Sequence, residues 1–297
     1  MGRERSKTYT FEFYTICPDA DDLFSMSVSQ AFEGIIDGSL ISSSRSYGST
    51  REFYDVRRWT AANSYSGQIR KIRQSELPEV GAPGRNSKQL TLDPDEGVIE
   101  RNFFVFYEDS SLLVFHRNDD GNAASHFAQL LSAAVGVLYL AHPVIQPDQA
   151  EKLLHGKLDI KKFSVKIPKP TNPKLYPQDT NSARALELLD NSGADNLEVT
   201  FTIDKKIETS AGRLSSSIQS SIGSLMSLGA TKAKIEVDDH GRIYPIDLIA
   251  NRLYSKQSVS TNSTFPPSES MYKLADKAKA DKEESINAYF GTGIRII

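Results

Sequence analysis

Alternating apolar and polar residues give the front of the chain a strand-rich pattern. Aromatic and polar residues alternate over Thr8–Ile16, as they do in a half-buried strand. Apolar residues then recur at helical spacing over Leu23–Ile36, and further strands are predicted over Glu52–Trp59 and Gly67–Arg73. Prolines and glycines recur over Ser75–Gly97, which excludes a regular element through the middle of that segment.

A hairpin followed by one helix is the most informative part of the pattern. Asn102–Tyr107 and Leu112–Arg117 flank a polar turn at Glu108–Ser111. Five of the six residues in the first strand are apolar, so both faces of this strand are expected to be covered. The apolar stretch His126–Leu140 predicts a helix that closes a first domain, and prolines at 143 and 147 mark its boundary.

The back half mixes helices and strands. Strands are predicted over residues 160–167, 197–203, 232–237 and 242–246, and helices over 147–155, 182–189, 213–228 and 246–254. We therefore predict an α+β protein with a strand-rich domain over 1–145 and a lysine-bearing α+β domain over 146–254. A Ser/Thr/Pro linker over Ser255–Ser270 and an exposed tail helix over Met271–Phe290 are expected to fill 255–297.

Charge and cysteine content narrow the class of protein. The 297 residues carry a formal net charge of −3, so any nucleic-acid surface must be a local patch. The single cysteine, Cys17, excludes an intrachain disulfide and suits a reducing cytoplasm. The longest apolar stretch is too short and too interrupted to span a bilayer, so we expect no direct membrane insertion.

Lysines gather at the start of the second domain, against a single acid, Asp159. Lysines so placed can lie along a phosphate backbone and release its counterions. Lysines on a sheet face also protect an exposed edge from aggregation, so a solvated face is the competing interpretation. The cluster comprises Lys157, Lys161, Lys162, Lys166, Lys169 and Lys174, of which all but the first are candidate DNA ligands.

A second basic cluster lies in the first domain. It interleaves cations with Tyr54, Trp59 and Tyr65, a combination that nucleic-acid and protein-binding surfaces share. Alternation equally predicts aromatics in the core and cations in solvent, and on pattern alone this second interpretation is favoured. The candidate ligands here are Arg57, Arg58, Arg70, Lys71 and Arg73.

Metal chemistry has one candidate. Glu236, Asp238 and Asp247 gather carboxylates of the kind that two-metal nucleases use to hold magnesium. The restriction-type pattern also requires a lysine two residues after its strand acid, and Asp238 occupies that position after Glu236. The five histidines show no zinc spacing, so we expect no cofactor, no metal and no catalytic residues.

The order of elements resembles that of the RexA-like exclusion proteins of lambdoid phages and of KwaB in the Kiwa anti-phage system. The resemblance rests on the paired strands Phe103–Phe106 and Leu112–Phe115, a glycine-containing turn, the helix at Phe127–Leu131, the strand Phe163–Ile167 and the lysine-bearing domain. It implies antiviral defence by a cytoplasmic, often homodimeric protein that binds double-stranded DNA with little sequence preference. It also implies a defence partner, membrane-bound in the Kiwa arrangement.

Three functions therefore remain open at this stage. The first is DNA binding through the phosphate backbone, without enzymatic activity. The second is a module that binds a protein partner in a defence complex, and the third is a magnesium-dependent nuclease built on Glu236, Asp238 and Asp247.

Overall fold

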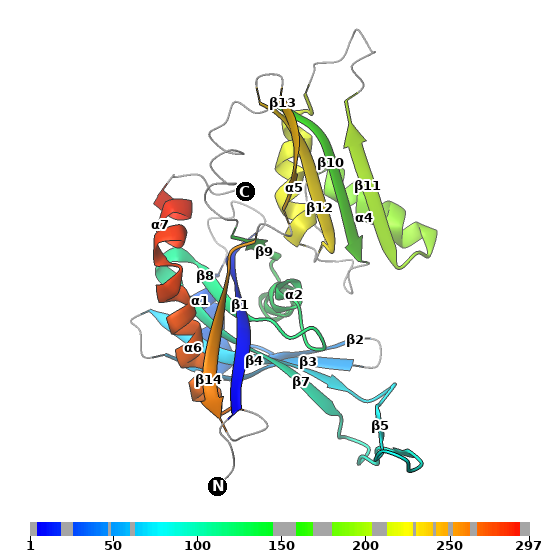
Figure 1. Ribbon diagram of the computed structural model, residues 1–297, viewed down its shortest axis with the longest axis vertical. Helices are drawn as coiled ribbons and strands as arrows, with labels where there is room; N and C mark the ends of the chain where they lie inside the picture. The colour runs from blue at the N-terminus through cyan, green and yellow to red at the C-terminus, as the bar shows by residue number, and fades with distance from the viewer. Residues whose placement is uncertain are drawn as a thin grey trace.

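The computed structural model describes residues 5–18, 26–46, 49–59, 63–144, 159–168, 180–203, 213–227, 230–239, 242–248, 252–261 and 266–291. Within these ranges the chain forms a large and a small antiparallel sheet with helices packed against both (Figure 1). The predicted α+β class is confirmed. No helix of the described ranges is long and apolar enough to cross a membrane.

The large sheet runs in the order β14-β1-β8-β7-β4-β3-β2, and β9 also pairs with β1. Every pairing in this sheet is antiparallel. Its strands are β1 (Arg5–Pro18), β2 (Ser43–Ser46), β3 (Ser49–Arg58), β4 (Ser64–Arg73), β7 (Val98–Tyr107), β8 (Leu112–His116), β9 (Tyr139–Pro143) and β14 (Tyr254–Thr261).

Strand β7 is apolar on both sides because helices cover both faces of the sheet. Phe104 and Phe106 pack with Phe32 and Phe127 beneath α1 (Val28–Ile36) and α2 (Ala124–Val135). On the opposite face Phe103 belongs to the cluster beneath α6 (Ser268–Asp281), which α7 (Glu283–Gly291) extends. Between β7 and β8 the predicted polar turn is a short 3₁₀ helix, Glu108–Ser110. The predicted loop over Ser75–Gly97 contains a two-strand hairpin of β5 (Glu79–Val80) and β6 (Lys88–Gln89).

The small sheet has the order β11-β10-β12-β13 and is formed by residues between β9 and β14. Its strands are β10 (Asp159–Pro168), β11 (Asn196–Thr202), β12 (Lys232–Asp239) and β13 (Arg242–Asp247). The helices of this unit, α4 (Thr180–Ser192) and α5 (Ser216–Ser227), cover one face, and α5 also packs on β9 (Figure 1). Phe163 of β10 and Phe13 of β1 belong to one continuous core, so the two sheets fold against each other.

The C-terminal region differs most from the prediction. The expected linker, Ser255–Ser270, instead contributes β14, whose residues pair with β1 from Arg5 to Glu12. The expected helix 246–254 is wrong where it can be compared, because Ile246 and Asp247 belong to β13 and Tyr254 begins β14. The tail helix docks on the body, with Met271 and Tyr272 fully buried. The predicted helix 147–155 lies outside the described residues.

Candidate functional site

The lysines of β10 lie on two surfaces. Phe163, Val165 and Ile167 point into the core, so Lys162 and Lys166 lie on the open face of the small sheet, as the alternation predicts. Lys161 follows a shift in register and is held by Asp159 and Asp238 at 3.7 and 3.4 Å. Lys169 and Lys174 lie outside the described residues.

Carboxylates from neighbouring strands neutralise most of the charge on this open face. The Lys162 ammonium lies 3.2 Å from Glu236, Lys232 lies 2.5 Å from Glu198, and Lys234 lies 3.5 Å from Asp247. Lys232 and, more weakly, Lys166 lower the pKa of Glu198, which therefore stays ionised. A polyanion laid across the face meets these acids, so the solvated ion-paired surface is the better interpretation of the lysine cluster.

Lysines of the small sheet also form ion pairs with the three carboxylates that were considered for metal binding. Glu236, Asp238 and Asp247 each pair with a different lysine, and the three side chains do not converge. No group of three histidine, cysteine or acidic side chains in the described ranges is placed to hold a metal ion. The structure gives the nuclease hypothesis no metal-binding geometry among these residues.

The arginine cluster of the first domain is divided by the alternation of β4. Arg70 faces the α6 side of the sheet, whereas Lys71 and Arg73 face the α2 side. Arg57 stacks over the rings of Trp59 and Tyr272 beside α6, with its guanidinium carbon 5.7 and 5.4 Å from the ring centres. Arg58 is bound by Glu33 at 2.7 Å. These five cations therefore do not form one surface.

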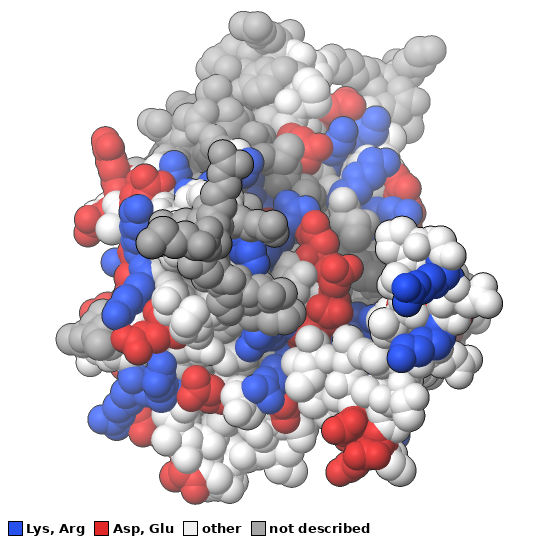
Figure 2. Space-filling model, turned by 60° about the horizontal axis from the view of Figure 1, so that its bottom comes forward, with Lys and Arg blue, Asp and Glu red and all other residues white. Residues whose placement is uncertain are grey.

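Charges of both signs are mixed on the face shown in Figure 2. Blue and red side chains alternate there without a continuous basic stripe, in agreement with the net charge of −3. Any phosphate-binding surface on this face must therefore be a small cluster of cations.

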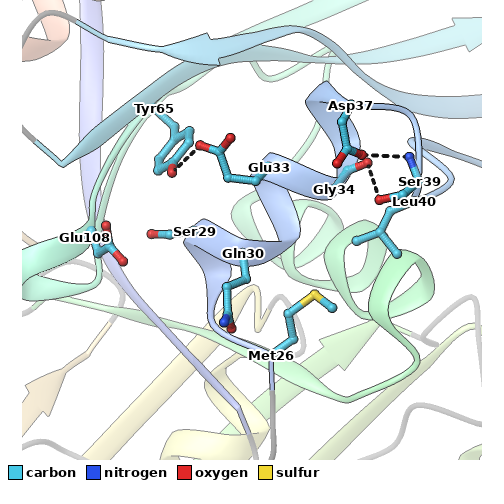
Figure 3. Close-up of a pocket in the computed structure, with 10 residues that line it drawn as sticks. All are labelled: Met26, Ser29, Gln30, Glu33, Gly34, Asp37, Ser39, Leu40, Tyr65 and Glu108. Atoms are coloured by element: carbon cyan, nitrogen blue, oxygen red, sulfur yellow. Dashed lines mark hydrogen bonds between the residues drawn. The ribbon is translucent and has the colours of Figure 1, made fainter.

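A hollow beside α1 is lined by acidic side chains. Glu33 and Glu108 line it together with Ser29 and Tyr65, whose hydroxyl donates to Glu33 at 2.7 Å (Figure 3). The bonds from Arg58 and Tyr65 lower the pKa of Glu33, so its carboxylate is ionised at neutral pH. An acidic hollow of this kind does not suit a phosphate group.

Cations from four strands converge instead on a cleft at the α6 side of the large sheet. Lys7 of β1, Arg70 of β4, Arg101 of β7 and Arg117, which follows β8, line a cavity of about 610 Å³. Arg70 and Arg101 are direct cross-strand partners, so both side chains leave the same face of the sheet. Among the described residues, Glu100 is the only acid in the lining. We call this feature the cationic cleft.

Two arginines of the cationic cleft are positioned by carboxylates at its edge. Arg70 donates to Glu52 at 3.5 Å and stacks on the ring of Tyr54. Arg117 donates to Asp119 at 2.8 Å, and its side chain remains 55% exposed. An exposed pair such as that of Arg117 with Asp119 contributes on the order of 1 kcal/mol or less, so a phosphate can share or replace this carboxylate.

The floor of the cationic cleft is aromatic and neutral. His116 is 8% exposed and is surrounded by the rings of Tyr9, Phe11 and Phe103, with centres 5.5 to 5.9 Å away. Burial lowers the pKa of His116 to about 4, so the imidazole is neutral at pH 7. An aromatic floor bordered by arginines can stack a base or ribose and contact phosphate at once.

The sequence indicated only Arg70 among the cations of this cleft. Arg101 and Arg117 stand alone in their own segments, and Lys7 lies in a short charged stretch with Arg3 and Arg5 that does not indicate a site. The signal that could have found Arg101 is the cross-strand register between β4 and β7, because it places Arg101 opposite Arg70.

The fold and the cleft define an α+β protein with a cationic pocket on its large sheet. Residues 45–277 match the model of a family of unknown function, DUF6731, and because this match covers most of the chain, the protein belongs to that family. The matched region includes the small sheet, the strands of the large sheet from β3 onward and most of α6, whereas β1 and α1 precede it. The sequence matches no curated protein.

Proposed function

We propose that the protein binds double-stranded DNA through its phosphate backbone, with little sequence preference, and that the cationic cleft makes the contacts. The observation that carries this proposal is the convergence of Lys7, Arg70, Arg101 and Arg117 from separate segments on one cavity, whose described lining contains a single acid, Glu100. The resemblance to phage exclusion proteins supplies the setting, which is antiviral defence.

Arginine suits this role better than the ion-paired lysines of β10. A guanidinium presents several N–H donors in a plane and binds phosphate oxygens in pairs. Arg70 and Arg101 are adjacent across two paired strands, so they can hold one phosphate between them. Contacts of this kind fix the duplex by charge and shape and read no base edges, which accounts for the absence of sequence preference.

The cellular setting follows from the resemblance and from the single cysteine. We propose that the protein acts in the cytoplasm as a homodimer, alongside a defence partner. Dimerisation doubles the number of cations offered to one duplex and so compensates for the acidic net charge of −3.

Fluorescence anisotropy with a labelled random-sequence duplex tests the proposal. The logarithm of the affinity is expected to fall linearly with the logarithm of salt concentration, with a slope of about −0.9 for each phosphate contacted. Each titration is run with magnesium and with chelator. No binding at low salt refutes DNA binding by the isolated protein, and loss of signal through cleavage with magnesium alone supports the nuclease instead.

Charge-matched variants locate the surface. Arg101→Gln and Arg117→Gln are each expected to reduce the salt slope by about 0.9, because each removes one phosphate contact. Arg58→Gln removes the same charge outside the cleft and is expected to leave the slope unchanged. Lys162→Gln with Lys166→Gln tests the open face of the small sheet. If that pair lowers the slope and the arginine variants do not, the cleft assignment is wrong.

A further inference from the structure

A second polar pocket lies on the other face of the large sheet, where the first turn of α2 meets the small-sheet unit. It has a volume of about 470 Å³, within the range of small-molecule sites. Arg117, Ser125 and His126 line it from the large-sheet unit, Thr231 lines it from the start of β12, and Arg252 lines it from just before β14. We call this feature the α2 pocket. Neither the sequence patterns nor the DNA-binding proposal uses it.

The start of α2 offers two backbone donors to the α2 pocket. The His126 N–H donates to the Ala123 carbonyl oxygen at 3.0 Å and the Ala123 N–H donates to His126 Nδ1 at 3.1 Å, so among the described residues only the N–H groups of Ala124 and Ser125 lack a partner at this terminus. Ser125 in the first turn is 8% exposed and lines the pocket, and its hydroxyl makes no hydrogen bond within the described ranges. Amide and hydroxyl donors at a helix N-terminus form the usual cradle for a phosphate.

Arg252 supplies an independent indication of an anionic ligand. Its Nε atom is buried without a hydrogen-bond partner, and no carboxylate of the described chain pairs with its guanidinium. The guanidinium stacks over the ring of Tyr14, whose centre lies 6.0 Å from the guanidinium carbon. A buried donor without an acceptor costs free energy, so an acceptor supplied by a ligand restores it.

The loop that carries this site is rigid before any ligand arrives. Asn102 donates to the carbonyl oxygens of His116 and Asn122 at 3.0 Å each and accepts from the Asn122 amide at 2.6 Å. A side chain at Gly121 would collide with Asn102, so the chain passes as closely as a glycine permits. A preorganised cradle loses little conformational entropy on binding.

The charges around the α2 pocket favour an anion. On the far side of the loop Arg51 donates to Asn122 at 3.1 Å, and Lys71 donates to the carbonyl oxygen of Asp120 at 3.4 Å. Of the acids that line the pocket, Glu12 accepts from the Tyr14 hydroxyl at 2.6 Å and Asp119 is held by Arg117. These two carboxylates are therefore engaged, whereas the Nε atom of Arg252 has no acceptor.

We propose that the α2 pocket binds the phosphate of a small phosphate monoester, held by the N-terminus of α2, Ser125 and Arg252. Walls from both units enclose the site, so its occupation ties the small-sheet unit to the large sheet. The cationic cleft lies on the opposite face of the large sheet. Among the described residues, the linings of the two sites share only Arg117 and Asn118.

Calorimetric titration of the full chain with inorganic phosphate and with glycerol 2-phosphate, in chloride at constant ionic strength, tests the proposal. Saturable binding of both is expected. Arg252→Gln is expected to weaken both by about tenfold, because it removes a charge-assisted hydrogen bond, and Ser125→Ala is expected to weaken them by a smaller factor. Arg252→Lys keeps the positive charge and is the control for the case in which the glutamine variant does not fold.

Two control variants make the result decisive. Arg45→Gln on β2 removes an equal charge at a residue that does not line the pocket and is expected to bind phosphate as the wild type does. Arg101→Gln removes a cation of the DNA-binding cleft and is also expected to leave phosphate binding unchanged. Absence of saturable binding, equal affinity of Arg252→Gln and Arg45→Gln, or loss of binding in Arg101→Gln alone would each overturn the proposal.

Discussion

His116 is expected to make the protein sensitive to mild acid. Its ring is 8% exposed inside a cage of Tyr9, Phe11 and Phe103, and its Nδ1 has no hydrogen-bond partner in the described chain. Burial without a partner penalises the imidazolium, and the pKa of His116 falls from 6.5 to about 4. Between these two values the unfolded chain binds a proton at this residue that the folded chain does not.

The sign and size of the effect follow from proton linkage. Because the unfolded state binds more protons, the free energy of unfolding falls as the pH falls from about 6.5 to about 4. At pH 5 the histidine of the unfolded chain is almost fully protonated and that of the folded chain is largely neutral. The loss of stability between pH 7 and pH 5 from His116 alone is about 2 kcal/mol.

Urea unfolding at pH 7 and pH 5, followed by circular dichroism, measures this loss. Other groups also titrate in this interval, so the comparison is made with His116→Phe, which fills an aromatic cage but carries no titratable nitrogen. The decrease in the free energy of unfolding from pH 7 to pH 5 is expected to be about 2 kcal/mol smaller in the variant. An equal decrease in both proteins would refute the burial argument.

Three further predictions concern the contacts that hold the fold. Asp276→Ala is expected to lower the free energy of unfolding by about 3 kcal/mol in urea titrations, because the carboxylate accepts from Trp59 Nε1 at 2.8 Å and from the Tyr107 hydroxyl at 2.5 Å; an unchanged midpoint would contradict this. Gly121→Ala is expected to cost about 1 to 3 kcal/mol by the same assay, because the new methyl group meets Asn102; a stability equal to the wild type would show that the loop can yield. Deletion of residues 266–297 is expected to expose the apolar face beneath α6, giving dye binding and a broadened thermal transition; a sharp transition without dye binding would contradict it.

The local sequence determined five strands of the large sheet, β1, β3, β4, β7 and β8, and the faces that they bury. Alternation over Thr8–Ile16 predicts β1, and the nearly continuous apolar run before Tyr107 predicts a strand covered on both faces. The same alternation placed Lys162 and Lys166 opposite the buried side chains of β10. These predictions succeed because a period of two residues fixes which side chains face the core, whatever the partner strand is.

No local pattern in the sequence places the C-terminal strand β14. The segment Tyr254–Thr261 is rich in serine and reads as a linker, yet it pairs with β1 at the other end of the chain. Its serine and glutamine side chains are satisfied only in the tertiary structure, where Ser255 donates to Asp281 at 2.8 Å and Gln257 donates to Ser255. A polar edge strand is stabilised by backbone pairing with a distant partner, which no local pattern records.

Tertiary structure alone also decided where positive charge collects. Of the lysines that are dense in the sequence, Lys161 pairs with Asp159 and Asp238 and Lys162 pairs with Glu236, so their charge is largely compensated. Arg101 and Arg117, isolated in the sequence, converge on one cavity because antiparallel pairing brings their strands together. The sequence by itself determined which residues are charged and which faces of the strands are buried. Register and packing between distant strands decided which charged side chains lie close together. The reason is that electrostatic interaction depends on distance in space and not on distance along the chain.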